Sequence, residues 1–180
     1  MELKSIYKSF GENEVLHDIN IVIPKSGRVL ISAPSGSGKT TLLRIMMGLE
    51  KPASGEIINR PRHQAAVFQE DRLPEEFTPV NCVKMTAAHG VTKDSIRRHL
   101  GLVGLEGHCD KPVSQLSGGM CRRVAIVRAV LSGADTVYFD EPFTGLDGDT
   151  KMQVIKYILT NCEGRTLIFV SHCPDDAGLL

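Results

Sequence analysis

One glycine-rich stretch constrains this chain more than any other feature of its sequence. Residues 33–41 read APSGSGKTT and follow the apolar run Val29–Ile31, which is typical of a buried strand. Gly36 and Gly38 permit the tight backbone turns that let several N–H groups point inward at the oxygens of a polyphosphate. The pattern therefore predicts a strand, a phosphate-binding loop and a helix in succession.

The residues that follow the glycines favour the same interpretation. Lys39 is a point charge that can reach the β- and γ-phosphates, and the hydroxyl of Thr40 can bind a magnesium ion. The N-terminus of a helix predicted over residues 41–48 would favour an anion. An ordinary turn is the less favoured alternative, because strand, loop, Lys-Thr pair and helix all occur in order. The predicted nucleotide-binding residues of this segment are Ser35, Gly36, Ser37, Gly38, Lys39, Thr40 and Thr41.

The rest of the chain alternates predicted strands and helices, which indicates an α/β fold with a mostly parallel sheet. Two strand-like pieces near the N-terminus predict a small antiparallel sheet, and a proline-punctuated stretch from Leu73 to about Gln115 predicts a helical insertion. The predicted strands are residues 2–8, 15–23, 28–32, 65–68, 136–139 and 166–170. The predicted helices are residues 41–48, 80–88, 93–103, 119–130 and 148–159.

Composition excludes several classes of protein. The 180 residues suffice for one domain with a sizeable core, and Lys+Arg and Asp+Glu both number 21, which argues against a nucleic-acid-binding surface. No apolar run approaches the ~20 residues needed to cross a bilayer, and the N-terminus lacks the apolar segment of a secretory signal. Five scattered cysteines are expected to be reduced packing residues. We therefore expect a cytoplasmic protein that works at a membrane only through a partner.

Two acids follow the predicted strand 136–139. Carboxyl ends of parallel strands face the ligand crevice of an α/β sheet, so both side chains are expected near the phosphate loop. Asp140 could hold magnesium through water, and Glu141 could polarise an attacking water. Two acids that merely begin a loop are the alternative, which the upstream phosphate loop makes less favoured.

A second anion-binding helix N-terminus is predicted at residues 116–120, which read LSGGM. Ser117, Gly118 and Gly119 open this helix far along the chain from the first loop. One nucleotide needs only one phosphate cradle. A second cradle makes sense where it serves a nucleotide held by another copy of the chain.

Together these motifs resemble those of the ATP-binding cassette (ABC) ATPases, and the likeness covers nearly the whole chain. The first loop matches the Walker A motif, LSGGM matches the LSGGQ signature, and residues 137–141 are similar to Walker B with its catalytic glutamate. The remaining matches are Phe10, the aromatic that stacks on adenine, Gln69, the Q-loop glutamine, Asp147 in the D-loop, and His172, the switch histidine.

The resemblance implies a P-loop NTPase (RecA-like) core that binds ATP and Mg²⁺ and hydrolyses ATP as a head-to-tail dimer. Glu141 would activate water and His172 would contact the γ-phosphate, while Asp147 would link the two sites. The signature residues Ser117, Gly118 and Gly119 would face the other subunit's nucleotide. The implied catalytic residues are Lys39, Gln69, Glu141 and His172, and the implied metal ligands are Thr40, Gln69 and Asp140.

The resemblance also divides the chain and marks departures from the family pattern. The ATP-binding core with its β subdomain is expected over residues 1–72 and 122–180, and the helical subdomain over 73–121. Ala33 replaces the first Walker A glycine, which is tolerable if its φ stays negative, and Met120 replaces the signature glutamine. The sequence ends at Leu180, where members usually add further strands and helices.

Transport is the first functional hypothesis: a cassette subunit on the cytoplasmic face of the cell membrane, paired with a second cassette and docked on a transmembrane permease. A non-transport ABC ATPase is the alternative. Chromosome and repair members are disfavoured because only the 46 residues 70–115 separate Gln69 from the signature, without heptads, and translation-type members usually carry two cassettes per chain.

A GTPase lacks support because no N-K-x-D motif occurs, and a small-molecule kinase would have no use for the LSGGM segment. Residues 67–73 are similar to the Q-loop of importers for nitrate, sulfonates and taurine, yet substrate and direction of transport stay open.

Overall fold

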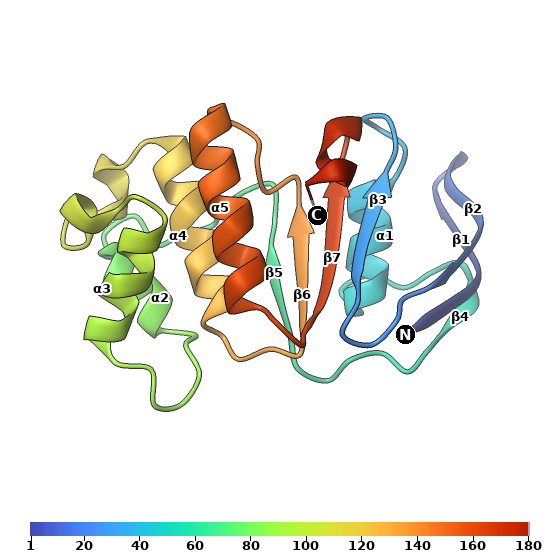
Figure 1. Ribbon diagram of the computed structural model, residues 1–180. Helices are drawn as coiled ribbons and strands as arrows, with labels where there is room; N and C mark the ends of the chain where they lie inside the picture. The colour runs from blue at the N-terminus through green and yellow to red at the C-terminus, as the bar shows by residue number, and fades with distance from the viewer. Residues whose placement is uncertain (180) are drawn as a thin grey trace.

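A four-stranded parallel sheet forms the centre of the computed structural model. The structure describes residues 1–179, except for the side chains of residues 174 and 175. The strands of this sheet lie in the order β3 (Arg28–Ser32), β7 (Thr166–Ser171), β6 (Thr136–Asp140) and β5 (Gln64–Val67), and every pairing is parallel. The strands β6 and β7 are buried along their whole length, as parallel strands covered on both faces must be. All four carboxyl ends therefore lie along one edge of the sheet, at the top of Figure 1.

A second, antiparallel sheet confirms the one predicted near the N-terminus and adds a strand to it. Its order is β2 (Asn13–Val22), β1 (Glu2–Phe10) and β4 (Ser54–Ile58). The strand β4 was not predicted, because a five-residue segment acquires its extended form from pairing with β1 rather than from a pattern of its own. Gly55 permits this pairing, since a Cβ there would lie 2.2 Å from the Ser5 carbonyl oxygen.

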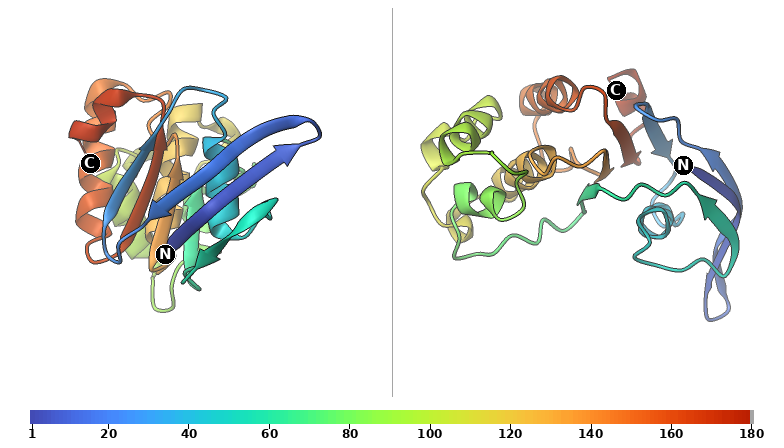
Figure 2. Two further views of the ribbon diagram at one scale, coloured as in Figure 1. Left: turned by 90° about the vertical axis from the view of Figure 1, so that its right-hand side faces the viewer. Right: turned by 90° about the horizontal axis from the view of Figure 1, so that it is seen from below.

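Helix α1 (Lys39–Met47) lies between the two sheets, as the right-hand view of Figure 2, seen from below, shows. Its apolar residues share one buried cluster with side chains of both sheets. Leu3 and Ile6 reach this cluster from the antiparallel sheet, and Tyr138 and Ile168 reach it from the parallel sheet. The helix that follows the phosphate loop is therefore fixed from both sides, and its N-terminus lies at the carboxyl edge of the parallel sheet.

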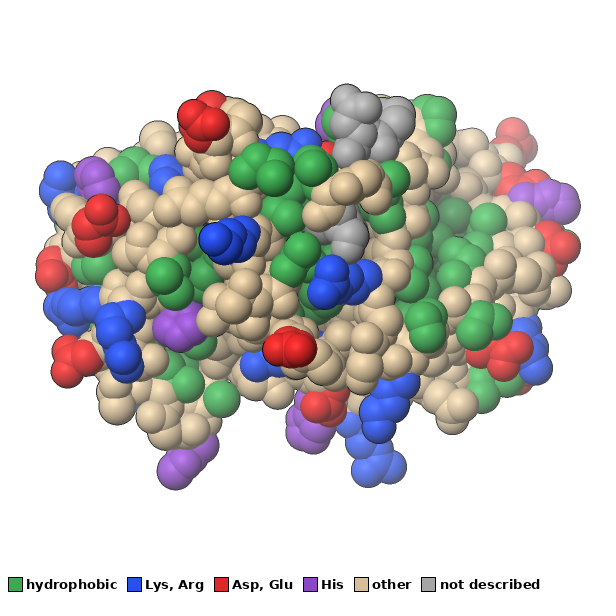
Figure 3. All heavy atoms as spheres, in the orientation of Figure 1, with side chains coloured by type: hydrophobic (Ala, Val, Ile, Leu, Met, Phe, Trp, Pro, Cys, Tyr) green, Lys and Arg blue, Asp and Glu red, His purple; other side chains and the backbone are tan. Residues whose placement is uncertain are grey.

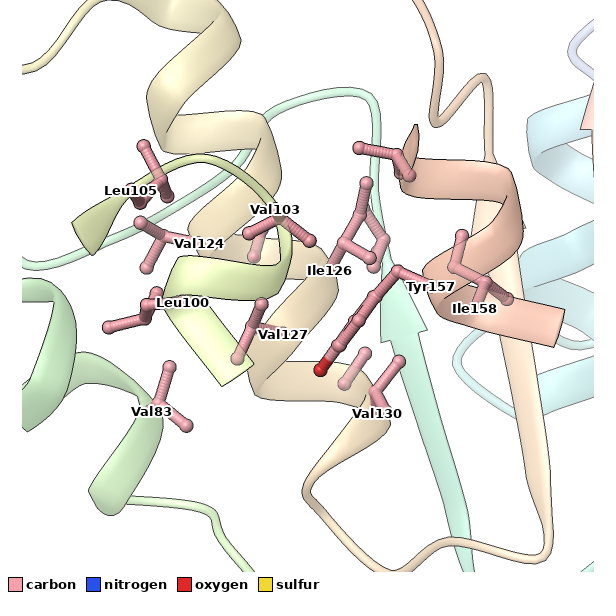
Figure 4. Close-up of a cluster of buried hydrophobic side chains, with 14 of the residues drawn as sticks. Val83, Leu100, Val103, Leu105, Val124, Ile126, Val127, Val130, Tyr157 and Ile158 are labelled. Atoms are coloured by element: carbon pink, nitrogen blue, oxygen red, sulfur yellow. The ribbon is translucent and has the colours of Figure 1, made fainter. Parts of the chain in front are cut away.

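The opposite face of the parallel sheet is covered by α4 (Gly118–Val130) and α5 (Gly148–Asn161). Because side chains alternate along a strand, Phe139 and Phe169 point to this face and stack with ring centroids 4.7 Å apart. Figure 4 shows the continuation of the cluster among α3, α4 and α5, where Leu100, Val127 and Tyr157 lie.

The predicted helical insertion is present, with different bounds. It consists of α2 (Pro79–Lys84) and α3 (Lys93–Leu102) with two short 3₁₀ segments, Glu106–His108 and Val113–Gln115. The prediction that the first helix continues to Ala88 was wrong, because the Ala88 N–H bonds to the carbonyl of Leu131 instead of to its own helix. A third 3₁₀ segment, Pro174–Gly178, follows β7.

The surface carries interspersed charges of both signs on the face drawn in Figure 3. Over residues 1–179, no helix combines the length and the apolar character needed to cross a bilayer.

Candidate nucleotide-binding site

A pocket of about 430 Å³ lies beside the glycine-rich loop. It gathers predicted residues from four separate segments of the chain, because the ends of β1, β3, β5 and β6 meet there. Val15, on β2, is the lining residue that the sequence analysis missed. The pocket is lined by Phe10, Val15, Ser35, Gly36, Gly38, Lys39, Thr40, Thr41, Gln69 and Glu141. Ser37 does not line it; its N–H donates to the Pro34 carbonyl at 3.3 Å within the loop.

The loop has the backbone that the sequence predicts. Gly38, the N-cap of α1, has φ 85°, and a Cβ there would lie 2.7 Å from Val15 Cγ1 and 2.9 Å from the Val15 carbonyl oxygen. Glycine is thus required at this position both by the backbone and by the approach of β2. The condition set for Ala33 is met, since it is not among the residues with positive φ.

Lys39 is buried and folds back over the loop. Its Nζ donates to the carbonyl oxygens of Ala33 at 2.7 Å and Pro34 at 2.8 Å. Both acceptors are neutral, whereas a phosphate oxygen would form a stronger, charge-assisted bond with the ammonium group. The side chain also lines the pocket, so it is available to an anion that enters.

Thr40 and Asp140 form the oxygen pair expected of a magnesium site. The Thr40 hydroxyl donates to Asp140 Oδ2 at 2.8 Å, although the two residues lie 100 positions apart. Burial raises the pKa of the Asp140 carboxyl, and the hydrogen bond from Thr40 opposes this rise. Asp140 is buried behind Thr40 and does not itself line the pocket, whereas Thr40 and Gln69 do. A buried carboxylate beside a hydroxyl, with a glutamine nearby, is a donor set of hard oxygens that fits Mg²⁺.

Glu141 and His172 are brought into contact at the ends of β6 and β7. His172 Nδ1 lies 2.6 Å from Glu141 Oε2, and the Thr144 hydroxyl donates to the same oxygen at 3.4 Å. Glu141 has φ 49° while its N–H still bonds to the carbonyl of Val170, so the chain turns out of the sheet at this residue. A left-handed conformation is strained for glutamate, and such strain clusters at functional sites.

A buried carboxylate that no sequence motif indicated fixes the segment after β7. Asp176 is 3% exposed and accepts hydrogen bonds of 2.5 Å from both Lys151 Nζ and the Ser171 hydroxyl. The Cys173 N–H donates to the same hydroxyl at 3.0 Å. His172 therefore lies in a turn that is tied to α5 through Lys151.

The signature residues and Asp147 lie together, outside the pocket. Ser117 caps α4 by accepting from the Met120 N–H at 3.3 Å, and a Cβ on Gly119 would lie 3.2 Å from the Gly145 carbonyl oxygen. Asp147 caps α5 through the N–H of Thr150 at 2.9 Å, and this backbone bond, with one from the Thr150 hydroxyl, lowers the pKa of Asp147. None of the residues Ser117, Gly118, Gly119 and Asp147 lines the pocket of its own chain.

Comparisons with known proteins agree with these motifs. A family model described as ABC transporter matches residues 16–144. The aliphatic sulfonates import ATP-binding protein SsuB 2 of Pseudomonas syringae pv. tomato is 35% identical over 179 residues, which cover 98% of this chain and 77% of that protein. The Fe(3+) ions import ATP-binding protein FbpC of Escherichia coli O157:H7 is 34% identical over 194 residues, which cover 98% of this chain and 56% of that protein.

A solved structure supports the fold independently. It is a dimeric structure of a post-hydrolysis state of the ATP-binding cassette MJ0796 bound to ADP and Pi, with a TM-score of 0.84 and 27% identity. The match covers 99% of this chain and 90% of that chain. Since the family model spans the glycine-rich loop, the signature and the two acids at the end of β6, this chain belongs to the ABC transporter family and is one of its ATP-hydrolysing cassettes.

Proposed function

We propose that this cassette drives import through a separate membrane-spanning partner, and that two cassettes close head-to-tail on two ATP molecules to do so. The observation that carries the proposal is the division of the predicted residues between two surfaces. Lys39, Thr40 and Glu141 line one pocket, whereas Ser117 and Gly119 lie outside it. A second copy of the chain would supply the signature that each pocket lacks.

Phe10 and the glycine-rich loop would bind the nucleotide. Phe10 is 52% exposed at the pocket, and Lys8 Nζ lies 4.9 Å from its ring centroid, so an adenine can stack on an open aromatic face. The N–H groups of the loop and the Lys39 ammonium group would bind the phosphates. Thr40, Asp140 and Gln69 would hold Mg²⁺, which supplies positive charge against the phosphate oxygens when bound.

Glu141 would act as the general base of hydrolysis. The two hydrogen bonds that its carboxylate accepts from described residues both go to Oε2, which leaves Oε1 to take a proton from the attacking water. His172 would hold the carboxylate in place and contact the γ-phosphate. ATP and water would thus yield ADP and phosphate, with the abstracted proton resting on Glu141.

The partner would dock beside the Q-loop. A hollow of about 330 Å³ lies there. It is lined by Asp71 of the core and otherwise by residues of the helical subdomain, among them Leu73, Leu116 and Cys121. We retain the division into a core (1–72 and 122–180) and a helical subdomain (73–121) as part of this proposal, because the hollow lies where the two meet. Relatives of nearly equal identity are named for sulfonates and for Fe(3+), so the partner, rather than the cassette, would choose the cargo.

The test is capture of the tagged protein from detergent-solubilised membranes of its native source. We expect a polytopic membrane protein in near one-to-one amount, which would place the cassette on the cytoplasmic face of the cell membrane. A Leu73→Arg variant, which puts a charge into the hollow, should lose this partner, whereas Val22→Arg on the exposed strand β2 should keep it. Recovery of ribosomes or of no membrane protein would favour the non-transport alternative.

A further inference from the structure

We propose that Arg122, on the signature helix α4, is a positioning residue that holds the Q-loop and thereby sets the place of Gln69 in the nucleotide pocket. The inference rests on the site proposed above and adds to it a residue that none of the matched motifs assigns. Arg122 would link α4, whose start would face the nucleotide of the second cassette, to the nucleotide site of its own chain.

The evidence is a forked contact between one guanidinium group and two successive carbonyl groups. Arg122 Nη1 donates to the Phe68 carbonyl at 2.5 Å, and Nη2 donates to the Gln69 carbonyl. Nη1 also lies 3.3 Å from Asp71 Oδ1. A single side chain from α4 therefore holds the Q-loop at Phe68, Gln69 and Asp71.

Burial makes this contact costly to break. The Arg122 side chain is 7% exposed and that of Asp71 is 18% exposed, so each charge depends on the other for compensation. Burial raises the pKa of the Asp71 carboxyl, whereas Arg122 and Arg128 oppose the rise. Asp71 Oδ1 accepts no hydrogen bond from the described residues, so its interaction with the guanidinium group is an ion pair alone.

A second arginine of α4 supports the same loop. Arg128 donates to the carbonyl groups of Asp71 at 3.3 Å and Arg72 at 3.5 Å. Arg72 has φ 44°, a conformation that a loop without external support rarely keeps. The Q-loop backbone is thus bound to α4 over residues 68–72, and a movement of α4 must either carry the loop along or break these bonds.

The contact between Arg122 and the Q-loop has a consequence for catalysis, because it joins the start of α4 to the nucleotide pocket. Arg122 lies five residues after Ser117, in the early turns of α4, and Gln69 lines the nucleotide pocket. A guanidinium fork fixes two carbonyl groups in direction as well as distance, which an ammonium group cannot do. We infer that closure of the signature on the partner's ATP and correct placement of Gln69 on the chain's own ATP are coupled through Arg122.

A double-mutant cycle on ATP turnover tests this inference. Arg122→Met should lower kcat by roughly 10–100-fold, the loss typical of a misplaced catalytic group. In a Gln69→Ala background the same change should lower kcat by no more than about twofold, because the position of an absent side chain no longer matters. Arg165→Met is the matched control, since Arg165 also donates to a carbonyl of α4, that of Val130 at 2.7 Å, but at the far end of the helix.

Each outcome decides between the possibilities. Arg165→Met should lower the melting temperature while kcat at 25 °C stays near the parent value. If Arg122→Met and Gln69→Ala slow turnover independently, so that their effects multiply, the positioning role is wrong and Arg122 only stabilises the fold. If the Gln69→Ala protein turns over ATP at the parent rate, the assignment of Gln69 to the site is wrong. The positioning role of Arg122, which depends on that assignment, is then wrong as well.

If the Arg122→Met protein does not fold, the Arg122→Lys protein provides a second test. The lysine keeps a charge beside Asp71 but cannot hold both carbonyl groups, so it should melt near the parent temperature and still turn over more slowly, by roughly tenfold. Parent-like turnover of a folded Arg122→Lys protein would overturn the proposal.

Discussion

Among the pocket residues with positive φ, Gly38 and Glu141 adopt this conformation for opposite reasons. Gly38 takes this conformation because it lacks a Cβ and because β2 leaves no space for one. Glu141 takes it in spite of its side chain, at the point where β6 ends and the carboxylate turns toward His172. The first residue is shaped by packing, and the second carries strain that the buried strands around it can support.

The two loop glycines offer a controlled test of this distinction. Gly36 and Gly38 have nearly the same φ, 80° and 85°, but a Cβ on Gly36 would meet no atom within 4 Å. Gly36→Ala should therefore lower the free energy of unfolding by about 1–2 kcal/mol, the cost of the left-handed backbone alone. Gly38→Ala should lower it by about 3 kcal/mol or more, because overpacking against Val15 adds to that cost.

Urea unfolding of the two variants measures the difference, and titration with ATP measures its effect on the site. We expect Gly38→Ala to bind ATP much more weakly than Gly36→Ala. Equal stabilities of the two variants would contradict the role assigned to the close approach of β2.

At the residue scale, a site residue can be identified from the sequence where a local motif fixes its type and spacing. Lys39, Thr40 and Gly38 could be placed because a phosphate loop imposes their types and spacing. Arg122 and Asp176 could not, because their partners are carbonyl groups and hydroxyls that only the folded chain brings near them. The roles of the predicted catalytic and binding residues stay predictions until the variants are measured.

At the scale of elements, the contact between α3 and α5 includes a histidine. His99 Nδ1 lies 3.0 Å from the Tyr157 hydroxyl, and the two rings meet edge to face with centroids 5.8 Å apart. Burial lowers the pKa of His99 below its ordinary value of 6.5, and the charge of Arg98 adds to this effect. The folded chain therefore keeps His99 neutral under conditions in which the unfolded chain protonates it.

This difference predicts a pH dependence of stability. As the pH falls through 6.5, the unfolded chain binds a proton at His99 that the folded chain does not, so the free energy of unfolding decreases until the lower, folded pKa is passed. His99→Gln should flatten this decrease between about pH 7 and 5. A slope of the His99→Gln protein equal to that of the parent, measured by urea unfolding over this pH range, would refute the prediction.

Helices and strands were predicted correctly where the local sequence pattern alone determines them. The helix α5 and the buried strands β6 and β7 have periodicity or apolar runs that need no context. The strand β4 and the early end of α2 were missed, because pairing with β1 and a bond to Leu131 decide them. These are contacts across the chain, which a local pattern does not contain.

At the scale of the whole molecule, the nucleotide pocket and the signature lie on two separate surfaces. The carboxyl edge of the parallel sheet carries the pocket, and the start of α4 carries Ser117 and Gly119 beside the D-loop. One cassette thus presents a phosphate loop and a signature that do not meet. The arrangement makes sense in a pair of cassettes, in which each supplies what the other lacks.

The most direct test of this account is the molar mass of the Glu141→Gln protein in solution, measured by light scattering with ATP, with ADP and without nucleotide. The account predicts monomers without nucleotide or with ADP, and dimers with ATP, because the variant binds ATP but hydrolyses it roughly 10²–10⁴-fold more slowly. Lys39→Ala in the same background should remain monomeric with ATP. A protein that binds ATP and stays monomeric, or a Glu141→Gln protein that turns over ATP at the parent rate, would contradict the account.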